Sequence, residues 1–457
     1  MRVDILNPEG HAMTLIDLTA PSVRSNRLAE LPVAIIGAGP IGLAAAAHLV
    51  ERGLDFVIYE AGDAIASSMR SWGHIRLFSP WKHLIDAAAR RLLEADGWTQ
   101  PRYQDRAPSG AELVEQYLAP LAALDAIASR IHTGVTVAAV TRQGMDRTRS
   151  NGRADTPFAL RITDAGGSVS EVIASAVIDA SGTYRNANSL GSNGLDPLGI
   201  DEVADHVTHA LPDVLGSERK RFAGKHITVV GAGHSAANTL INLATLIQTE
   251  PGTTVTWVIR NTTAARVFTA ESDELPDRSS LGAKVQRLVN FGVIDVVDQF
   301  EIIGLSKAGD RVDVAGLRHG GVEHITTDLI VNATGFRPDL GILREVRLSL
   351  DEIVEAPVKL APLIDPNVHS CGTVEPHGFA ELQQPEPNFF IAGMKSYGRA
   401  PTFLLATGYE QVRSITAYLA GDLAAATNVE LVLPATGVCS TGSTDASCDT
   451  GASSCCS

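Results

Sequence analysis

Residues 31–60, LPVAIIGAGPIGLAAAAHLVERGLDFVIYE, decide the fold of this chain. An apolar run at 33–36 is followed by a glycine turn and an alanine-rich segment, which predict a buried strand, a tight turn and a helix over 40–52. Gly53 stands where a left-handed cap residue usually ends a helix, and a second apolar run leads to Glu60. This order of elements is a βαβ unit, from which parallel sheets are built.

Gly37, Gly39 and Gly42 are the chemically informative residues of this unit. In a dinucleotide-binding fold, glycines at this spacing allow a tight turn, close approach of the backbone to a diphosphate, and close packing of helix on strand. The diphosphate lies at the helix N-terminus, where free amides and the helix dipole favour an anion. Glu60 follows about 20 residues later, where an acid accepts hydrogen bonds from an adenosine ribose. Together these residues predict a dinucleotide site, whereas the glycines alone would also fit a turn that binds nothing.

A second copy of the pattern, KHITVVGAGHSAANTLINLATLI, occupies residues 225–247. Gly231, Gly233 and Ser235 follow an apolar strand and are candidate contacts to a second dinucleotide. Ala236 stands at the third glycine position, a replacement that dinucleotide sites tolerate. The sequence therefore predicts two nucleotide sites on one chain.

The two copies differ in charge at the end of their second strand. Arg260 occupies the position that Glu60 holds in the first copy. A carboxylate there would repel a 2′-phosphate, whereas a guanidinium can pair with it through two hydrogen bonds. The second nucleotide is therefore expected to be NADPH, although a solvated arginine at a strand end would give the same sequence.

The composition favours a globular protein with a small-molecule substrate. The 457 residues include 37 basic and 52 acidic side chains, and the net charge of −15 disfavours binding to nucleic acid or to an anionic membrane surface. No apolar run approaches the roughly 20 residues that span a bilayer. The first residues, MRVDILNPEGHAM, lack the apolar core of a signal peptide, so we expect a cytoplasmic protein.

Four segments resemble one family of flavoproteins. They are residues 33–60, 179–182 (DASG), 225–236 and 332–339 (NATGFRPD), and they are similar to the superfamily of flavin-containing monooxygenases and thioredoxin-reductase-like enzymes. The resemblance covers nearly all of residues 31–425. It implies FAD in the first site, NADPH in the second, and hydride transfer from nicotinamide to flavin. It also implies that Gly182, Thr334 and Gly335 approach FAD.

The resemblance predicts an α/β fold with two Rossmann-type domains of three-layer ββα architecture, the NADPH domain inserted into the FAD domain. Short strands are expected at 135–140, 158–162 and 172–180, and a long helix at 402–419. The expected division is an N-terminal extension (1–30), the FAD-binding domain (31–215 and 336–430), the NADPH-binding domain (216–335) and a flexible, cysteine-bearing tail (431–457).

Cysteine spacing separates two branches of this superfamily. Thioredoxin reductases need a CxxC dithiol in the nucleotide domain, but this chain has no CxxC and no cysteine between residues 225 and 330. GAGHSAAN, from Gly231, is instead similar to the GxGNSAxD segment of the monooxygenases, with His234 and Asn238 as replacements. The monooxygenase branch is therefore favoured.

Three less sharply defined segments resemble the flavin monooxygenases found with bacterial arsenic-resistance operons. They are RSWGHIRLFSPW from Arg70, GMKSYGRAPTFLLATGYEQ from Gly393, and a tail that opens LPATGVCS. Trivalent arsenic is soft and prefers thiolates. The tail thiols Cys439, Cys448, Cys455 and Cys456 are candidate metalloid ligands, or incidental thiols on a disordered tail. Their spacing is not that of a zinc site, and no metal site is expected.

Few catalytic side chains are expected, because a flavin monooxygenase mainly excludes water and holds its oxygenated intermediate. Trp72 and His74 follow the first βαβ unit closely, and His377 and Tyr397 lie in the C-terminal part of the FAD domain. These four are the candidates to face the flavin, and Arg70 and Gly393 are candidate contacts to the cofactor. Each alone would also fit a structural role.

The leading hypothesis is an NADPH- and FAD-dependent monooxygenase that uses O₂ and a flavin peroxide to oxygenate a small molecule at a soft sulfur, nitrogen or trivalent arsenic centre. The first alternative is an NADPH-dependent flavin reductase that passes electrons to a disulfide, metalloid or quinone. The second is a metalloid-binding protein on a flavoprotein scaffold. The sequence leaves a homodimer open.

Overall fold

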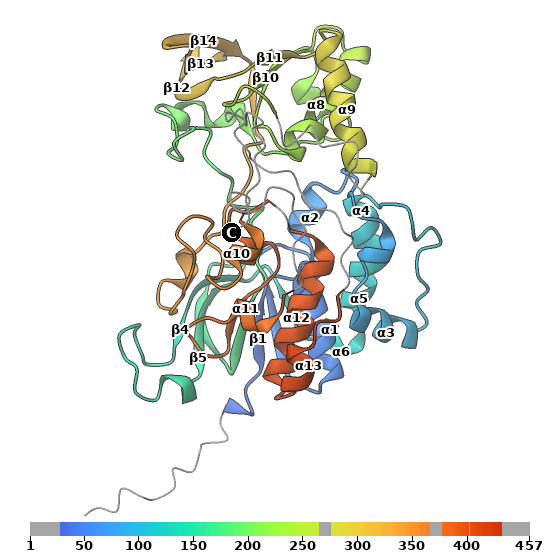
Figure 1. The fold of residues 1–457 in the computed structure, drawn as a ribbon, viewed down its shortest axis with the longest axis vertical. Helices are drawn as coiled ribbons and strands as arrows, with labels where there is room; N and C mark the ends of the chain where they lie inside the picture. The colour runs from blue at the N-terminus through green and yellow to red at the C-terminus, as the bar shows by residue number, and fades with distance from the viewer. Residues whose placement is uncertain (1–27, 265–275, 366–376, 402, 432–457) are drawn as a thin grey trace, which may run out of the picture.

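The computed structural model describes residues 28–264, 276–365, 377–401 and 403–431. These residues form two five-stranded sheets and two three-stranded sheets. Figure 1 shows the first large sheet and its helices in the lower part of the molecule, and the second with α8 (His234–Thr249) and α9 (Pro276–Asn290) in the upper part. The prediction of an α/β fold with two Rossmann-type domains is confirmed.

The first sheet has the order β16-β7-β1-β2-β3, and its neighbouring strands all run parallel. Its strands are β1 (Val33–Ile36), β2 (Phe56–Glu60), β3 (Ile131–Thr133), β7 (Ala176–Asp179) and β16 (Phe389–Ile391). The chain passes from β1 to β2 on one side, whereas β7 lies on the other. The carboxyl ends of β1 and β7 therefore form the switch point at which open parallel sheets bind ligands.

This sheet is the middle of three layers, with helices on one face and a strand meander on the other. The side chains of Val33 and Ile35 pack on helices α1 (Pro40–Glu51), α3 (Ala87–Ala95) and α12 (Leu405–Leu419). Those of Ala34 and Ile36 pack on a meander of β4 (Thr136–Arg142), β5 (Phe158–Thr163) and β6 (Val169–Ala174). Because both faces are covered, β1 is apolar throughout rather than alternating. The predicted ββα architecture is confirmed.

The prediction of one continuous strand at 172–180 is wrong. The structure divides it at Ser175 into β6 of the meander and β7 of the parallel sheet. The Ser175 hydroxyl donates to the Leu31 carbonyl (2.9 Å) and its amide to the Pro32 carbonyl (3.0 Å). Its neighbours Ala174 and Ala176 are both apolar and buried, so the hydrophobic pattern contains no sign of this change of layer.

The second sheet has the order β11-β10-β9-β15-β8, again with parallel neighbours. Its strands are β8 (Val207–Thr208), β9 (His226–Val230), β10 (Thr254–Val258), β11 (Asp295–Val297) and β15 (Leu329–Asn332), and its meander is β12 (Glu301–Ala308), β13 (Arg311–Arg318) and β14 (Gly321–Thr327). All of them lie between β7 and β16 in the sequence, which confirms the insertion. Because β8 belongs to this sheet, the chain crosses to it before the boundary expected at residue 215.

The remaining helices are short and connect these layers. They are α2 (Ser67–Ser71), α4 (Gly110–Leu113), α5 (Ala119–Ala123), α6 (Asp125–Ala128), α7 (Arg219–Phe222), α10 (Ala361–Ile364), α11 (Phe379–Leu382) and α13 (Leu423–Thr427). Among the described residues, no helix combines the length and the hydropathy that a membrane crossing requires.

Candidate cofactor and active site

A cavity of about 780 Å³ extends from the first glycine turn to the N-terminus of α8. Its lining includes Gly37 and Gly39 from the turn between β1 and α1, and Gly182 and Gly393 from the segments after β7 and β16. At its other end the lining includes His234, Ser235 and Asn238, which lie in the first turns of α8. One cavity thus joins the two regions that the sequence assigns to different nucleotides.

The first glycine turn has the geometry that a diphosphate requires. Gly37 has φ +99°, and a Cβ there would lie 2.8 Å from the Ala180 carbonyl oxygen. A Cβ on Gly42 would lie 1.9 Å from the Gly37 carbonyl oxygen, so α1 packs directly on the turn. Gly39, at the N-cap of α1, has no atom within 4 Å of that position. The open space beside free helix amides fits a dinucleotide.

Glu60 lines the cavity and also holds the turn together. Its carboxylate accepts hydrogen bonds from the amides of Ala38 (2.9 Å) and Gly62 (2.7 Å) and from the Ser67 hydroxyl (2.8 Å). Glu60 is 7% exposed. The same carboxylate therefore fixes the glycine turn and stands where we predict contact with the adenosine ribose.

The second glycine turn repeats this arrangement. Gly231 has φ +129°, and a Cβ there would lie 2.1 Å from the Ala333 carbonyl oxygen, while Gly233 has open space at the N-cap of α8. Ala236 is fully buried beneath the turn, so its methyl group is accommodated there. Arg260 lies exposed just beyond β10 and does not line the cavity. Its contact with a 2′-phosphate stays a prediction.

Of the four candidate catalytic side chains, the structure brings only Trp72 to the cavity. Its ring lies against Gly110, where a Cβ would come within 2.8 Å. His74 is exposed and does not line the cavity. Arg70, a cofactor-binding candidate, is likewise exposed and outside the lining, and its Nε donates to the Ile65 carbonyl (3.0 Å). α2 and the turn after it direct these two side chains away from the cavity.

His377 and Tyr397 are buried behind the cavity and do not line it. Burial raises the pKa of Tyr397 far above its usual range, so the phenol stays protonated. The His377 ring lies 5.7 Å from the Tyr397 ring and within 2.9 Å of the Gln411 amide nitrogen. Gln411 also accepts a hydrogen bond from the Gly393 amide (2.7 Å). These residues therefore support the Gly393 loop instead of facing the cavity.

Thr334 and Gly335 belong to the connection between the two sheets and do not line the cavity. The Thr334 hydroxyl hydrogen-bonds with Asn332 (2.7 Å), and the Gly335 carbonyl accepts from the Asn188 amide (2.9 Å). The two connecting segments run side by side through these bonds. Phe336, one residue further along, does reach the lining.

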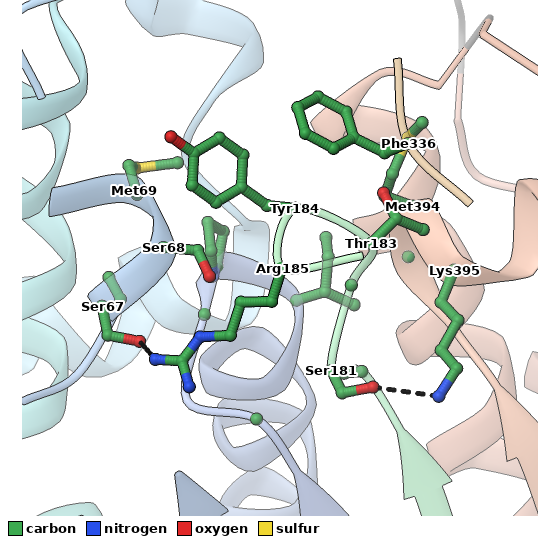
Figure 2. Close-up of a pocket in the computed structure, with 18 of the residues that line it drawn as sticks. Ser67, Ser68, Met69, Ser181, Thr183, Tyr184, Arg185, Phe336, Met394 and Lys395 are labelled. Carbon is green, nitrogen blue, oxygen red and sulfur yellow. Dashed lines mark hydrogen bonds between the residues drawn. The ribbon is translucent and has the colours of Figure 1, made fainter. Parts of the chain in front are cut away.

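An aromatic wall that the sequence did not indicate lines part of this cavity. Tyr184 and Phe336 line the cavity, with ring centroids 5.3 Å apart, and Figure 2 shows them with Met69 and Met394 around the same space. Phe78, from the loop after α2, lies 5.1 Å from the His234 ring at the start of α8. The rings of Phe78, Tyr184, His234 and Phe336 come from four separate segments, so no local motif could have predicted the wall.

A buried ion pair also lies in this region, and its lysine lines the cavity. Lys395 Nζ lies 2.7 Å from Asp179 Oδ2 and 3.1 Å from the Ser181 hydroxyl. Figure 2 shows Lys395 and Ser181 approaching from different elements, with Arg185 bound to Ser67 opposite. In the sequence, Lys395 and Asp179 stand out only as members of the segments GMKSYGR and DASG.

A comparison with protein families decides the identity of the fold. Residues 34–368 match the family described as pyridine nucleotide-disulphide oxidoreductase. The chain belongs to this family. It is therefore an oxidoreductase. Binding of the nucleotides at its two glycine turns stays a prediction.

Individual relatives of this oxidoreductase include both reductases and monooxygenases. A ferredoxin–NADP reductase from Granulibacter bethesdensis is 26% identical over 352 residues, which is 74% of this chain and 80% of the relative. Bacillithiol disulfide reductase from Bacillus cereus has a TM-score of 0.64 at 19% identity, covering 86% of this chain and 99% of that one. A flavin monooxygenase from Stenotrophomonas maltophilia has a TM-score of 0.55 at 23% identity, covering 85% and 99%. The two solved structures are similar in fold.

All five cysteines of this oxidoreductase lie outside the described residues, including the candidate ligands Cys439, Cys448, Cys455 and Cys456. Within the described ranges, no group of three or more His, Cys, Asp or Glu side chains could hold a metal ion. The similarity to arsenic-operon monooxygenases stays a prediction, since these comparisons establish the broader family only.

Proposed function

We propose that this oxidoreductase takes hydride from NADPH onto FAD and uses O₂ to oxygenate a small molecule at a soft sulfur, nitrogen or trivalent arsenic centre. The observation that carries the proposal is the cavity shared by the first glycine turn and the N-terminus of α8. A shared cavity lets a nicotinamide meet a flavin without a diffusing carrier. FAD and NADP(H) are the cofactors, and bound FAD supplies the hydride acceptor and the reaction with O₂.

The residues of the chain bind and orient the two nucleotides and exclude water from the cavity. Gly39 and the free amides of α1 receive the diphosphate of FAD, and Glu60 receives its ribose. Ser235 and the N-terminus of α8 receive the second nucleotide. The aromatic wall of Tyr184 and Phe336 lines the same cavity and keeps the reaction space apolar.

The cavity chemistry favours oxygenation over disulfide reduction. A dithiol relay needs two cysteines next to the flavin, but no described residue is a cysteine and the sequence has no CxxC. The relatives include a flavin monooxygenase, which supports the same direction. A reductase is the second candidate, because the relatives also include a bacillithiol disulfide reductase. In that case electrons would leave to a disulfide, metalloid or quinone, with tail cysteines as a relay.

The amounts of NADPH and O₂ consumed for each product formed distinguish a monooxygenase from a reductase. Protein loaded with FAD is first reduced with NADPH without oxygen, and then given O₂ with arsenite or a dialkyl thioether. A monooxygenase consumes one NADPH and one O₂ for each oxygenated product formed. Substrate turnover at full rate without O₂ would overturn the proposal. Anaerobic NADPH oxidation with an added disulfide or quinone as the electron acceptor, lost after Cys439, Cys448, Cys455 and Cys456 are changed to serine, would establish the reductase.

The Arg260→Ala variant tests the choice of nicotinamide. We expect kcat/KM for NADPH to fall by about 10- to 100-fold, the effect of losing one charge-assisted contact, while the value for NADH changes little. Steady-state reduction of FAD with each cofactor measures this. Arg90→Ala, which removes an exposed arginine of α3, is the control. An equal decrease in kcat/KM for NADPH and NADH would show that Arg260 does not contact the 2′-phosphate.

A further inference from the structure

The two halves of the chain use the same turn after a central strand. In the first, Asp179 Oδ1 accepts hydrogen bonds from the Ser181 amide (3.1 Å) and hydroxyl (2.6 Å). In the second, Asn332 Oδ1 accepts from the Thr334 amide (3.3 Å) and hydroxyl (2.7 Å). The motifs DASG and NATG are therefore structural equivalents. Because a neutral asparagine makes the turn in the second half, the turn does not require a carboxylate.

The charge of Asp179 has another partner. Its second oxygen, Oδ2, lies 2.7 Å from Lys395 Nζ, and the two residues are 0% and 1% exposed. In the second half, the remaining amide group of Asn332 donates to the Asn188 carbonyl instead (2.9 Å). A buried ammonium is costly unless a carboxylate accompanies it. The difference between the two halves is thus a buried cation next to the first nucleotide site.

Lys395 lies near the glycine turn, where the diphosphate is expected to bind. A Cβ on Gly37 would lie 3.0 Å from Ser181 Cα, and Ser181 in turn hydrogen-bonds with Lys395. The loop that carries Lys395 begins at Gly393, where a Cβ would lie 3.0 Å from Ile41 in the first turn of α1. Lys395 is therefore linked to the glycine turn through Ser181, its loop begins beside the first turn of α1, and it lines the cavity.

The ammonium has bonding capacity left for a ligand. Within the described part of the chain, Asp179 and Ser181 account for two of its three N–H donors. The other cations of the cavity lining, Arg76 and Arg185, are exposed. Lys395 is thus the buried cation of the lining, where a charge interacts strongly with an anion.

We infer that Lys395 recognises the diphosphate of the dinucleotide in the first site, and that Asp179 is the positioning residue that keeps this ammonium buried at the glycine turn. The inference rests on the proposed binding of FAD. It adds a side-chain cation to a site in which backbone amides and a helix N-terminus otherwise face the anion.

The test compares the double variant Asp179→Asn/Lys395→Met with the natural protein. The double variant reproduces the neutral turn of the second half, so it leaves no unpaired buried charge. Lys395→Met alone is the second variant, and Lys359→Met, an exposed lysine, is the control. The dissociation constant of FAD and the inhibition constant of ADP as a competitor of FAD are measured on the apoprotein, together with its thermal unfolding.

We expect both constants to rise by about 10- to 100-fold in the double variant, with unfolding little changed, because one charge-assisted contact is lost. Unchanged constants for both ligands would overturn the inference. A rise for FAD alone would overturn the assignment to the diphosphate, since ADP carries the diphosphate without the flavin. Failure of the natural protein to bind FAD would overturn the proposed function, and ADP affinity would still test Lys395 separately.

Discussion

Replacing Glu386 by glutamine is expected to lower the free energy of unfolding by about 3–5 kcal/mol, the cost of leaving buried charges without their partner. Glu386 is 1% exposed and lies just before β16. Its carboxylate is 2.8 Å from Arg142 Nε and 2.7 Å from Arg153 Nη2. Both arginines are buried, and the Arg142 guanidinium also lies 3.6 Å over the Phe158 ring. The substitution removes the counter-charge of two guanidinium groups at once.

This cluster connects residues that lie on opposite sides of the inserted domain in the sequence. Arg142 and Arg153 come before the inserted nucleotide domain, and Glu386 comes after it. The cluster therefore joins the two parts of the FAD domain after the chain returns. Urea unfolding of the variant, followed by circular dichroism, measures the loss. Glu171→Gln is the control, because its pair with Arg161 is more than half exposed and should contribute at most about 1 kcal/mol.

The same cluster predicts a pH dependence. Burial raises the pKa of Glu386, but hydrogen bonds from Arg153 and Arg142 outweigh this effect, so the pKa lies below its usual value. A carboxyl group with a lowered pKa stabilises the folded state above the pKa it has when unfolded. That stabilisation is lost as the pH falls through the folded-state pKa. The stability difference between the natural protein and Glu386→Gln should therefore shrink in acid, and a constant difference would contradict the assignment.

Gly42→Ala is expected to destabilise α1 and to abolish FAD binding. A Cβ at this position would lie 1.9 Å from the Gly37 carbonyl oxygen. The Cβ is fixed to the helix backbone and the oxygen belongs to the backbone of the turn, so neither atom can move alone. The helix would have to move away from the glycine turn, at a cost of about 3 kcal/mol or more. Thermal unfolding and flavin retention during purification measure the two effects.

Gly39→Ala provides the matched comparison at the same turn. Gly39 has φ −81°, and no atom lies within 4 Å of a Cβ placed there, so the variant should fold with unchanged stability. Its methyl group would occupy the space that we assign to the diphosphate, and FAD affinity should therefore fall. A stable Gly42→Ala protein, or a Gly39→Ala protein with full affinity, would contradict the roles assigned to these glycines.

Repeated local patterns explain how much of the fold the sequence could predict. The glycine turns at Gly37 and Gly231 require close backbone contacts that other residues cannot make, so they mark both Rossmann units directly. Gly53 has the left-handed conformation expected of a helix stop. The break at Ser175 escaped prediction, because apolar residues on both sides serve two different layers.

The same distinction applies to the candidate site, where several residues in recognisable motifs line the cavity and others predicted for the site do not. Gly39, Glu60, Gly182, Ser235 and Gly393 line the cavity, and each belongs to a short segment of the sequence that is similar to a family motif. The assignments of His74, His377 and Tyr397 relied on proximity in the sequence or on residue type, and the structure places all three outside the lining.

The sequence by itself determined the two nucleotide units, their order and the interrupted domain, because those features depend on short-range backbone constraints. Only the tertiary structure decided which side chains share the cavity. Tyr184 meets Phe336, and Asp179 meets Lys395, across separations of more than 150 residues that no local period records. Burial brought these partners together, since aromatic rings leave water and a buried ammonium requires a carboxylate.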